Sequence, residues 1–373
     1  MAKKKRKLRV EFRKNREKRA RRGDLTRRAV DSLEQPAAPD DFDARESLSG
    51  KGALSRRRTV IGTEDEAGVV RDVDLSKCLS GRVLSSRGLH SLVRGDDGAR
   101  YDCTVRRVLR TMSRDERNAV VTGDIVLFQP GGEGQGVIER VEPRSGTISR
   151  TSKGREHVIV ANVDQVLIVG SAGEPALKAN LIDRFLVSAG KGNVRAVVCV
   201  NKVDLTEPAG LVSIAGIYGR LGCEVVFASA TQGAGIGRLR ALLKNRQTVL
   251  AGQSGVGKSS LLNAIEPSLE LAVSSVSEWT QKGRHTTRAA TLIELGAGGW
   301  VVDTPGIRQL DLWDVSPEEV EGHFVEFRPF VTLCRFPDCT HTHETGCGVQ
   351  QAVARDMITR MRYESYVRMI EGD

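Results

Sequence analysis

Short apolar runs separated by Gly/Asp turns dominate the chain between residues 81 and 150. The runs of strand length are Gly81–Leu84, His90–Val93, Tyr101–Val108, Asp124–Phe128 and Gly136–Val141. Five strands within about seventy residues predict a small β-barrel. An OB-fold, which often binds oligonucleotides, fits this pattern, and an SH3-like barrel fits it equally well.

From residue 164 onward, wholly apolar runs alternate with helical stretches, a pattern typical of a parallel sheet covered by helices. The expected buried strands are Asp164–Val169, Arg195–Val200, Cys223–Phe227, Thr248–Ala251 and Trp300–Asp303. Helices are expected from about Pro175 to Gly190 and, in the C-terminal tail, from Gln350 to Met369. The longest apolar runs have only the length of a strand, so no transmembrane helix is expected.

The segment Gly252–Ser259 has the sequence Gly-Gln-Ser-Gly-Val-Gly-Lys-Ser and lies between an expected strand and the expected helix Ser260–Ile265. In this setting, backbone N–H groups and the helix dipole favour a phosphate group, which argues against a chance glycine-rich turn. Lys258 is expected to reach the β- and γ-phosphates, and the Ser259 hydroxyl to bind Mg²⁺. The expected nucleotide-binding residues of this loop are Gly252, Gly255, Val256, Gly257, Lys258, Ser259 and Ser260.

A second motif, Asn-Lys-Val-Asp, begins at Asn201, at the end of an expected buried strand. Its carboxylate can accept two hydrogen bonds from guanine, and a site built on such bonds rejects the wrong base by about 10⁴-fold. Alone, the tetrapeptide fits a solvated turn; beside a phosphate loop it predicts guanine recognition. Ala228-Ser-Ala follows another strand and fits a second guanine loop. The expected base-binding residues are Asn201, Lys202, Asp204, Ser229 and Ala230.

The third motif is Asp-Thr-Pro-Gly, from Asp303 to Gly306. Asp303 is expected to hold Mg²⁺ through water, and the Gly306 N–H to lie near the γ-phosphate. Many GTPases have a water-orienting glutamine next, where this chain has Ile307. His285, in the segment Gly-Arg-His-Thr-Thr, could orient water instead, and a threonine of that segment is expected to ligate Mg²⁺. The residues alone equally allow a loop histidine without a role.

These motifs together predict hydrolysis of GTP to GDP, but their order is rotated. The guanine motif lies about fifty residues before the phosphate loop, and the metal motif follows that loop. An ordinary small GTPase has the phosphate loop first, then the metal motif, then the guanine motif.

Three cysteines and two histidines are concentrated in residues 334–347. Structural zinc takes four such ligands, and Cys₃His is a common set. A disulfide is the alternative, but it is disfavoured in a chain without an apolar secretory signal. On spacing alone, either histidine could complete the set. The candidates are Cys334, Cys339, His341, His343 and Cys347.

The chain resembles the ribosome small-subunit-dependent GTPase A family, circularly permuted GTPases that act in small-subunit maturation. The resemblance covers most of the chain from about Gly81 and depends on the permuted order, on Gln253–Ser260, on Gly283–Thr287 and on the cysteine cluster. It implies an OB-fold that contacts ribosomal RNA, a role for His285 in hydrolysis, and Thr287 as the magnesium-linked threonine. It also implies one zinc ion. The implied zinc ligands are Cys334, Cys339, His341 and Cys347.

One departure from the family pattern is Thr345, where the family usually has proline; this affects only the expected stiffness of the loop.

The net charge of +10 is concentrated at the N-terminus. Residues 1–28 hold fifteen Lys or Arg against three acids, a net of +12, which leaves −2 for the remainder. Such an arm commonly binds RNA phosphates, although a solubilising tail is the alternative. Residues 29–75 are polar and loop-prone and are expected to form a disordered linker.

The expected fold is multidomain. A basic arm and linker (1–78) precede an OB-fold RNA-binding domain (79–150), a circularly permuted α/β GTPase domain (151–322) and a helical zinc-binding module (323–373). We expect a cytoplasmic, monomeric GTPase that binds the small ribosomal subunit and its rRNA and no membrane. The subunit should stimulate hydrolysis, which is coupled to late maturation of the subunit and to release of the enzyme. The alternatives are a permuted GTPase of the large subunit and a nucleotide-stabilised RNA-binding scaffold.

Overall fold

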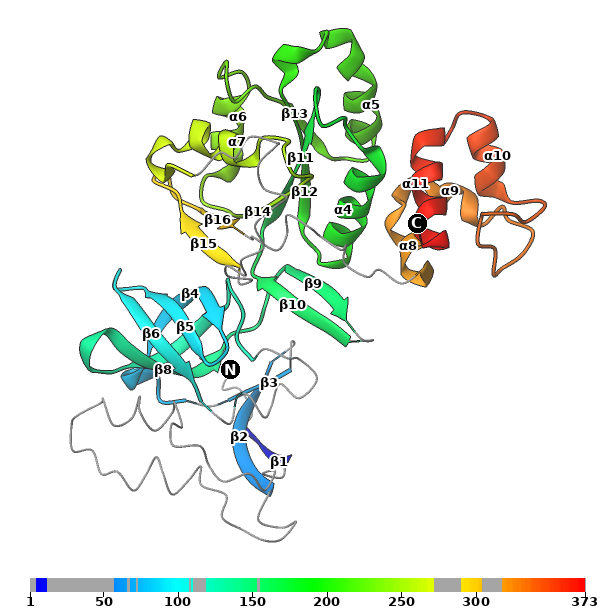
Figure 1. The fold of residues 1–373 in the computed structure, drawn as a ribbon. Helices are drawn as coiled ribbons and strands as arrows, with labels where there is room; N and C mark the ends of the chain where they lie inside the picture. The colour runs from blue at the N-terminus through cyan, green and yellow to red at the C-terminus, as the bar shows by residue number, and fades with distance from the viewer. Residues whose placement is uncertain are drawn as a thin grey trace, which may run out of the picture. The chain divides into compact units, whose positions relative to one another are not determined.

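A computed structural model describes residues 5–11, 57–65, 68–71, 73–106, 109, 119–152, 155–271, 290–303 and 317–372. The chain divides into two compact units (Figure 1). One comprises residues 1–145, 153–162 and 289–292, and the other comprises residues 146–152, 163–288 and 293–373. The first contains a β-barrel, and the second contains a parallel sheet with helices.

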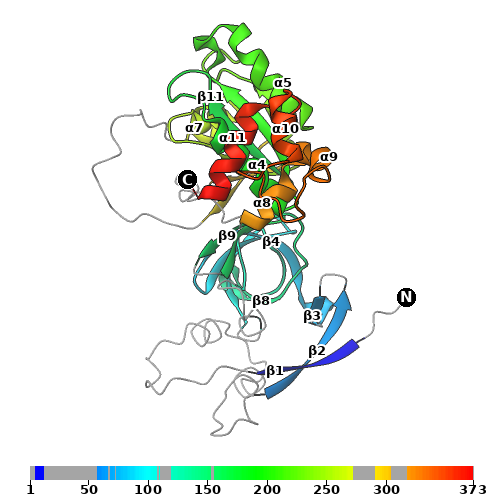
Figure 2. The same cartoon turned by 90° about the vertical axis from the view of Figure 1, so that its right-hand side faces the viewer.

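The barrel has five strands, and Figure 2 shows it as a ring. They are β4 (Leu79–Arg87), β5 (His90–Gly95), β6 (Arg100–Val105), β7 (Ile125–Pro130) and β8 (Gln135–Val141). Strand β4 pairs with both β5 and β7, and the parallel pair β6–β8 closes the ring. Val83, Val93 and Phe128 fill its interior. All five expected strands are present, and their arrangement is that of an OB-fold.

Three further strands precede the barrel, where the sequence predicted an arm and a disordered linker. Strand β2 (Arg57–Asp65) pairs antiparallel with β1 (Lys5–Glu11) on one side and with β3 (Gly68–Arg71) on the other. The expectation of a linker without strands is therefore wrong for β2 and β3. Residues 59–63 are largely β-branched, which favours an extended backbone despite the neighbouring charges.

The second unit is built on a sheet of five parallel strands in the order β13-β12-β11-β14-β16. Every position of β11 is buried, because helices cover both faces of a parallel sheet. Each expected apolar run forms one of these strands. They are β11 (Gln165–Ser171), β12 (Arg195–Asn201), β13 (Glu224–Phe227), β14 (Gln247–Ala251) and β16 (Trp300–Asp303).

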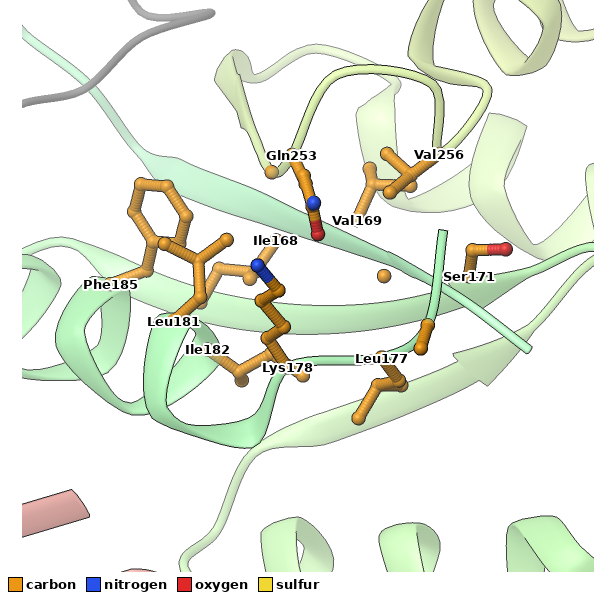
Figure 3. A pocket seen from close by; sticks show the side chains of 13 residues that line it. Ile168, Val169, Ser171, Leu177, Lys178, Leu181, Ile182, Phe185, Gln253 and Val256 are labelled. Carbon is orange, nitrogen blue, oxygen red and sulfur yellow. The ribbon is translucent and has the colours of Figure 1, made fainter. Parts of the chain in front are cut away.

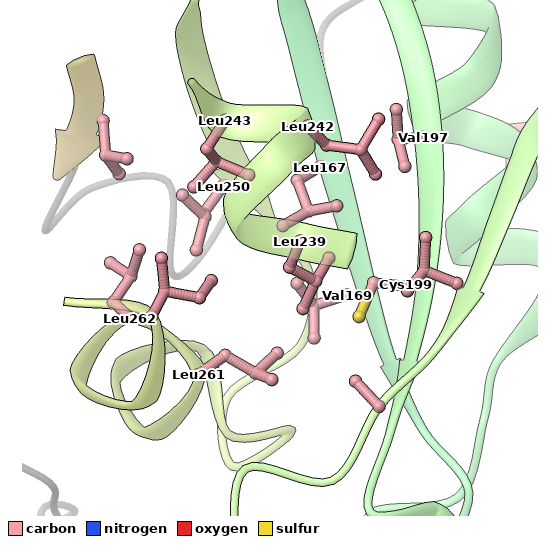
Figure 4. Packing of buried hydrophobic residues seen from close by; sticks show 14 of the residues in the cluster. Leu167, Val169, Val197, Cys199, Leu239, Leu242, Leu243, Leu250, Leu261 and Leu262 are labelled. Atoms are coloured by element: carbon pink, nitrogen blue, oxygen red, sulfur yellow. The ribbon is translucent and has the colours of Figure 1, made fainter. Parts of the chain in front are cut away.

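Helices α4 (Ala179–Lys191) and α5 (Val212–Arg220) cover one face of this sheet, and α6 (Ile236–Leu243) and α7 (Lys258–Ile265) cover the other (Figure 1). Because side chains alternate along a strand, Leu167 and Val169 of β11 face α6 and α7, where they pack with Leu239 and Leu261 (Figure 4). This core fixes the ends of β11, β12 and β14 relative to one another.

The C-terminal segment of the second unit is helical. It contains α8 (Pro317–His323), α9 (Arg328–Val331), α10 (Gly348–Ala354) and α11 (Arg360–Glu371). The expected helical tail from Gln350 to Met369 is present but consists of two helices, because Asp356, which has a left-handed backbone (φ 55°), lies between α10 and α11. None of the helices in the described part of the chain combines the length and apolar character needed to span a bilayer.

The remaining strands are β9 (Thr147–Ser152), β10 (Arg155–Ala161) and β15 (Thr291–Glu294). Short 3₁₀ turns span Leu75–Lys77, Gly132–Gly134, Val203–Leu205, Pro208–Leu211, Pro267–Leu269 and Val325–Phe327.

Candidate nucleotide and metal sites

The predicted phosphate loop joins β14 to α7, as expected, and its glycines have conformations that other residues rarely adopt. Gly252, Gly255 and Gly257 have φ values of 135°, 82° and 93°. A Cβ atom on Gly252 would lie 2.1 Å from the carbonyl oxygen of Val169, and one on Gly257 would lie 2.4 Å from Nδ2 of Asn201. The loop is therefore pressed against the end of β11 and against the guanine motif.

Asn201 connects three of the predicted nucleotide segments. Its side chain is 1% exposed, and its Nδ2 donates to the carbonyl oxygen of Val256 at 2.9 Å. Its Oδ1 accepts a hydrogen bond from the backbone N–H of Ala230 at 3.3 Å. One buried amide thus joins the guanine motif to the phosphate loop and to the second guanine loop, although about fifty residues separate the first two in sequence.

The other residues of the guanine motif have distinct environments. Lys202 has a left-handed backbone (φ 63°), and its Nζ donates to the carbonyl oxygen of Gly255 at 2.8 Å and also to that of Glu174. Asp204, in the turn Val203–Leu205, is exposed. Its carboxylate is therefore accessible to a ligand at the edge of the sheet where the phosphate loop also lies.

In the second guanine loop, Ser229 is fully buried, and its Oγ accepts a hydrogen bond from the backbone N–H of Gln232 at 3.1 Å. The backbone N–H groups of Ser229 and Ala230 donate to Ala234 O at 3.0 Å and to Asn201 Oδ1. Because both donors have protein acceptors in this arrangement, contact of this loop with a base oxygen stays a prediction.

Lys258 begins α7, and its Nζ donates to the carbonyl oxygens of Gly252 and Gln253, at 2.7 Å each. Ser259 and Ser260 follow in the first helical turn. Asp303 is the last residue of β16, which runs parallel to β14, so both strands end at the same edge of the sheet. This arrangement provides a helix N-terminus, an ammonium group and loop N–H groups near one another, a combination that suits phosphate. Three predicted site residues, His285, Thr287 and Gly306, lie outside the described part of the chain, and so does Ile307.

A pocket lies beside the phosphate loop, between the end of β11 and the start of α4. Its walls are mainly apolar, with Phe185 and Leu181 on α4 and Val256 on the loop. The amine of Lys178 and the amide of Gln253 point toward one another across it (Figure 3). None of the five residues predicted to bind the base lines this pocket, so it is separate from the predicted base site.

The C-terminal cysteines and one histidine converge on a point. The three Sγ atoms and a ring nitrogen of His341 all lie within 4.8 Å of one another. His341 Nδ1 is 3.5 Å from Cys334 Sγ and 3.4 Å from Cys347 Sγ. The cluster consists of Cys334, Cys339, His341 and Cys347. Three thiols and an imidazole at these separations fit a tetrahedral zinc ion.

The two histidines that could complete the ligand set differ in their burial. His341 is 1% exposed, whereas His343 is exposed and its Nδ1 lies 2.9 Å from Thr342 Oγ1. The geometry therefore favours His341 as the fourth ligand. All seven cysteines are free thiols in this structure, which favours a metal site over the disulfide alternative.

Backbone groups and burial both act on the thiols. The N–H groups of Gly348 and Gln350 donate to Cys334 Sγ at 3.3 Å and to Cys347 Sγ at 3.4 Å. Burial raises the pKa of Cys339 to about 12 and also raises the pKa of Cys347. Zinc binds thiolates, so an ion bound here must displace protons.

Sequence reasoning missed the side chains that hold the cluster loop in place. The hydroxyl of Tyr363 donates to His341 O at 2.8 Å, and that of Tyr366 donates to Thr340 O at 2.9 Å. Both tyrosines belong to α11, and their spacing of three residues, which places them on one helix face, is the only sequence signal for this role.

Comparison with known proteins identifies relatives across most of the chain. The model of the family described as RsgA GTPase matches residues 141–313. The small ribosomal subunit biogenesis GTPase RsgA of Yersinia enterocolitica is 37% identical over 313 residues, which is 81% of this chain and 87% of the relative. That of Chlorobaculum tepidum is 38% identical over 310 residues, which is 80% of this chain and 99% of the relative.

Two solved structures have a similar fold. The crystal structure of YjeQ from Thermotoga maritima has a TM-score of 0.64 and 36% identity, covering 79% of this chain and 98% of YjeQ. YloQ, described as a circularly permuted GTPase, has a TM-score of 0.61 and 27% identity, covering 81% of this chain and 97% of YloQ. The rotated motif order, the geometry of the two sites and these similarities agree, and the chain belongs to the RsgA family of circularly permuted GTPases.

Proposed function

We propose that this protein binds the small ribosomal subunit and couples GTP hydrolysis to late maturation of the subunit and to its own release. The observation that carries the nucleotide part of the proposal is the buried Asn201 amide, which joins the guanine motif to the phosphate loop. The relatives named as small ribosomal subunit biogenesis GTPases support the choice of partner.

In this proposal, the exposed Asp204 carboxylate accepts the guanine donors, and the phosphate loop from Gly252 to Ser260 holds the phosphates with Lys258. Ser259, Thr287 and Asp303 hold Mg²⁺, which neutralises charge on the β- and γ-phosphates when it is bound. The glycine conformations support the assignment of the phosphate loop, because a Cβ atom at Gly252 or Gly257 would collide with the surrounding atoms.

We assign the orientation of the attacking water to His285. Ile307 occupies the position where many GTPases carry a glutamine, and an aliphatic side chain can neither accept nor donate a hydrogen bond. An imidazole can do both, which makes His285 the group in the switch segment best suited to the task.

We assign one structural zinc ion to Cys334, Cys339, His341 and Cys347. The chemistry of the donor set supports this, since three thiols and one imidazole converge within 4.8 Å. The ion would fix the loop between α9 and α10, within the proposed C-terminal module of residues 323–373. The GTPase domain proposed for residues 151–322 precedes it, after the proposed RNA-binding barrel at residues 79–150.

The ribosomal contact is proposed to involve rRNA, with the barrel and the basic arm of residues 1–28 as RNA-binding parts. The enzyme is proposed to act as a cytoplasmic monomer, since the particle it acts on supplies the partner surface. Hydrolysis is proposed to be stimulated by the small subunit.

Co-sedimentation with purified ribosomal subunits tests this proposal. In the presence of a non-hydrolysable GTP analogue, the protein should sediment with the small subunit, and with GDP it should remain in the supernatant. Sedimentation with the large subunit instead would favour the alternative large-subunit function. Binding that is independent of the nucleotide would favour an RNA-binding scaffold.

A further inference from the structure

The imidazole of His341 lies between the cysteine cluster and a carboxylate that belongs to a different element. Its Nδ1 faces the sulfurs of Cys334 and Cys347, and its Nε2 points away from them. Oε2 of Glu321, in α8, lies 3.5 Å from Nε2. Within the described part of the chain, Nε2 is buried and makes no hydrogen bond, and the Glu321 carboxylate is the charged group that lies beside it.

The orientation of this ring is set by its surroundings. The carbonyl oxygen of His341 accepts hydrogen bonds from the hydroxyl of Tyr363 at 2.8 Å and from Nε2 of Gln350 at 3.3 Å. The ring of Phe327 packs against the imidazole in a T-shaped arrangement, with a centroid distance of 6.1 Å. The backbone of His341 and its ring are therefore both held, with Nε2 directed toward Glu321.

The two ring nitrogens must have different roles when a metal is bound. The nitrogen that coordinates the metal offers its lone pair, so the proton of the neutral imidazole is on the other nitrogen. With Nδ1 toward the thiols, Nε2 carries the proton and requires an acceptor. A carboxylate in that position fixes the tautomer, orients the ring and makes the coordinating nitrogen more basic.

We propose that Glu321 is a positioning residue of the metal cluster, whose carboxylate accepts the Nε2–H of His341 and keeps Nδ1 available to zinc. This inference rests on the proposed zinc site. Helix α8 packs against α4, which covers one face of the nucleotide-binding sheet. Lys191 Nζ in α4 and Glu319 Oε2 in α8 are 2.7 Å apart. Glu321 precedes the first cysteine by more than ten positions and belongs to a different element of the chain.

The direct test is the zinc affinity of the full-length protein and its variants, measured by competition with a chromophoric chelator. Glu321→Ala should weaken zinc binding by about 10- to 100-fold, the range found when such outer partners are removed. Glu321→Gln should be weakened less, because the amide oxygen still accepts a hydrogen bond. The matched control is Glu319→Gln, which alters a carboxylate on the same helix that pairs with Lys191.

The variants distinguish positioning of the ligand from packing of the helix. Unchanged zinc affinity in Glu321→Ala would overturn the proposal. Equal weakening in Glu319→Gln and Glu321→Ala would also overturn it, because the effect would then belong to the seating of α8. Wild-type protein that binds no zinc would overturn the proposed metal site itself, a failure that is visible before any variant is compared.

Thermal unfolding with and without zinc supplies a second readout. If Glu321 acts on the metal ligand, Glu321→Ala should lower the Tm of the zinc-loaded protein and leave that of the zinc-free protein nearly unchanged. Equal lowering of both Tm values would assign Glu321 a merely structural role and contradict the proposal.

Discussion

At the scale of single residues, the proposed selectivity for guanine depends on the carboxylate of Asp204. This side chain is exposed, so an isosteric change should leave the fold intact, while the buried Asn201 continues to hold the loops together. The base-recognition role can therefore be tested separately from folding.

Asp204→Asn should weaken GTP binding by about 100-fold or more relative to xanthosine triphosphate, because two hydrogen bonds to a charged acceptor are lost. The amide presents a donor where guanine also has donors, whereas xanthine offers an oxygen there. Competition binding with both nucleotides measures the ratio. Equal GTP affinity in the variant and the wild type would refute the assigned role.

His285→Ala should retain GTP binding and reduce turnover by about 100-fold or more, because no other side chain is assigned to orient the water. The effect should therefore fall on kcat and leave nucleotide affinity unchanged. Single-turnover hydrolysis with and without small subunits provides the comparison. Unimpaired turnover in the presence of the subunit would mean that another group orients the water.

Cys339→Ser should abolish stoichiometric zinc and destabilise the C-terminal helices, since the remaining three ligands cannot complete the tetrahedron. Elemental analysis of protein purified without chelators gives the zinc content, which should be one ion per wild-type chain. Cys78→Ser, at a half-buried thiol outside the cluster, serves as the control and should retain the ion. Zinc-free wild-type protein would contradict the assignment.

Site residues could be predicted from the sequence where they belong to one continuous motif whose residue types are required by the local backbone. The phosphate loop has this property, because a Cβ atom at Gly252 or Gly257 would collide with its neighbours and the pattern of glycines is therefore fixed. The choice between His341 and His343 could not be made from spacing, since it is burial that separates them. Glu321 has no local signal, because its proximity to His341 arises only when α8 and the cluster loop pack together.

At the scale of elements, the C-terminal helices are attached to the nucleotide-binding sheet through a buried ion-pair network. Arg362 of α11 is 2% exposed, and its Nη1 lies 2.7 Å from Oδ1 of Asp183 in α4. Its Nε is 2.7 Å from Glu326 Oε1, and its guanidinium carbon lies 4.2 Å from the centroid of the Phe324 ring. Burial raises the pKa of Asp183, and the charge of Arg362 opposes that effect.

Arg362→Met should lower the free energy of unfolding by about 3 to 5 kcal/mol, because it leaves the Asp183 carboxylate buried without its cationic partner. Arg368→Met, at an exposed position of the same helix, should change it by less than about 0.5 kcal/mol. Denaturant unfolding followed by a probe in the second unit gives both values. A loss as small as that of the control would show that the buried pair does not hold the helices in place.

Strands and helices could be predicted from the sequence to different degrees, depending on how burial and charge are distributed along them. Strands β11, β12 and β14 are buried on both faces and appear in the sequence as continuous apolar runs. Strands β2 and β3 were missed because charged residues flank their short β-branched runs. The break between α10 and α11 lies at Asp356, whose left-handed backbone has no unambiguous signal in the sequence.

At the scale of the whole molecule, the charge is unevenly distributed, with +12 in residues 1–28 and −2 in the remainder. Deletion of residues 1–28 removes strand β1 but no strand of the barrel or of the parallel sheet. GTP binding and basal hydrolysis are therefore expected to survive this deletion.

The deletion should reduce affinity for the small subunit and make its dependence on salt shallower. Each lost phosphate contact removes about 0.7 to 0.9 from the slope of log affinity against log salt concentration. Titrations of the wild type and the truncated protein at several salt concentrations give the two slopes. Parallel lines would indicate that the arm is a solubilising tail and that other parts of the protein make the RNA contacts.

The permuted nucleotide site is proposed to hydrolyse GTP in response to the small ribosomal subunit. The most direct measurement is the rate of GTP turnover by the full-length protein alone, with purified small subunits and with purified large subunits. Turnover should be slow in the protein alone, strongly stimulated by the small subunit and unchanged by the large one. Stimulation by the large subunit, or a rate indifferent to both, would contradict the account.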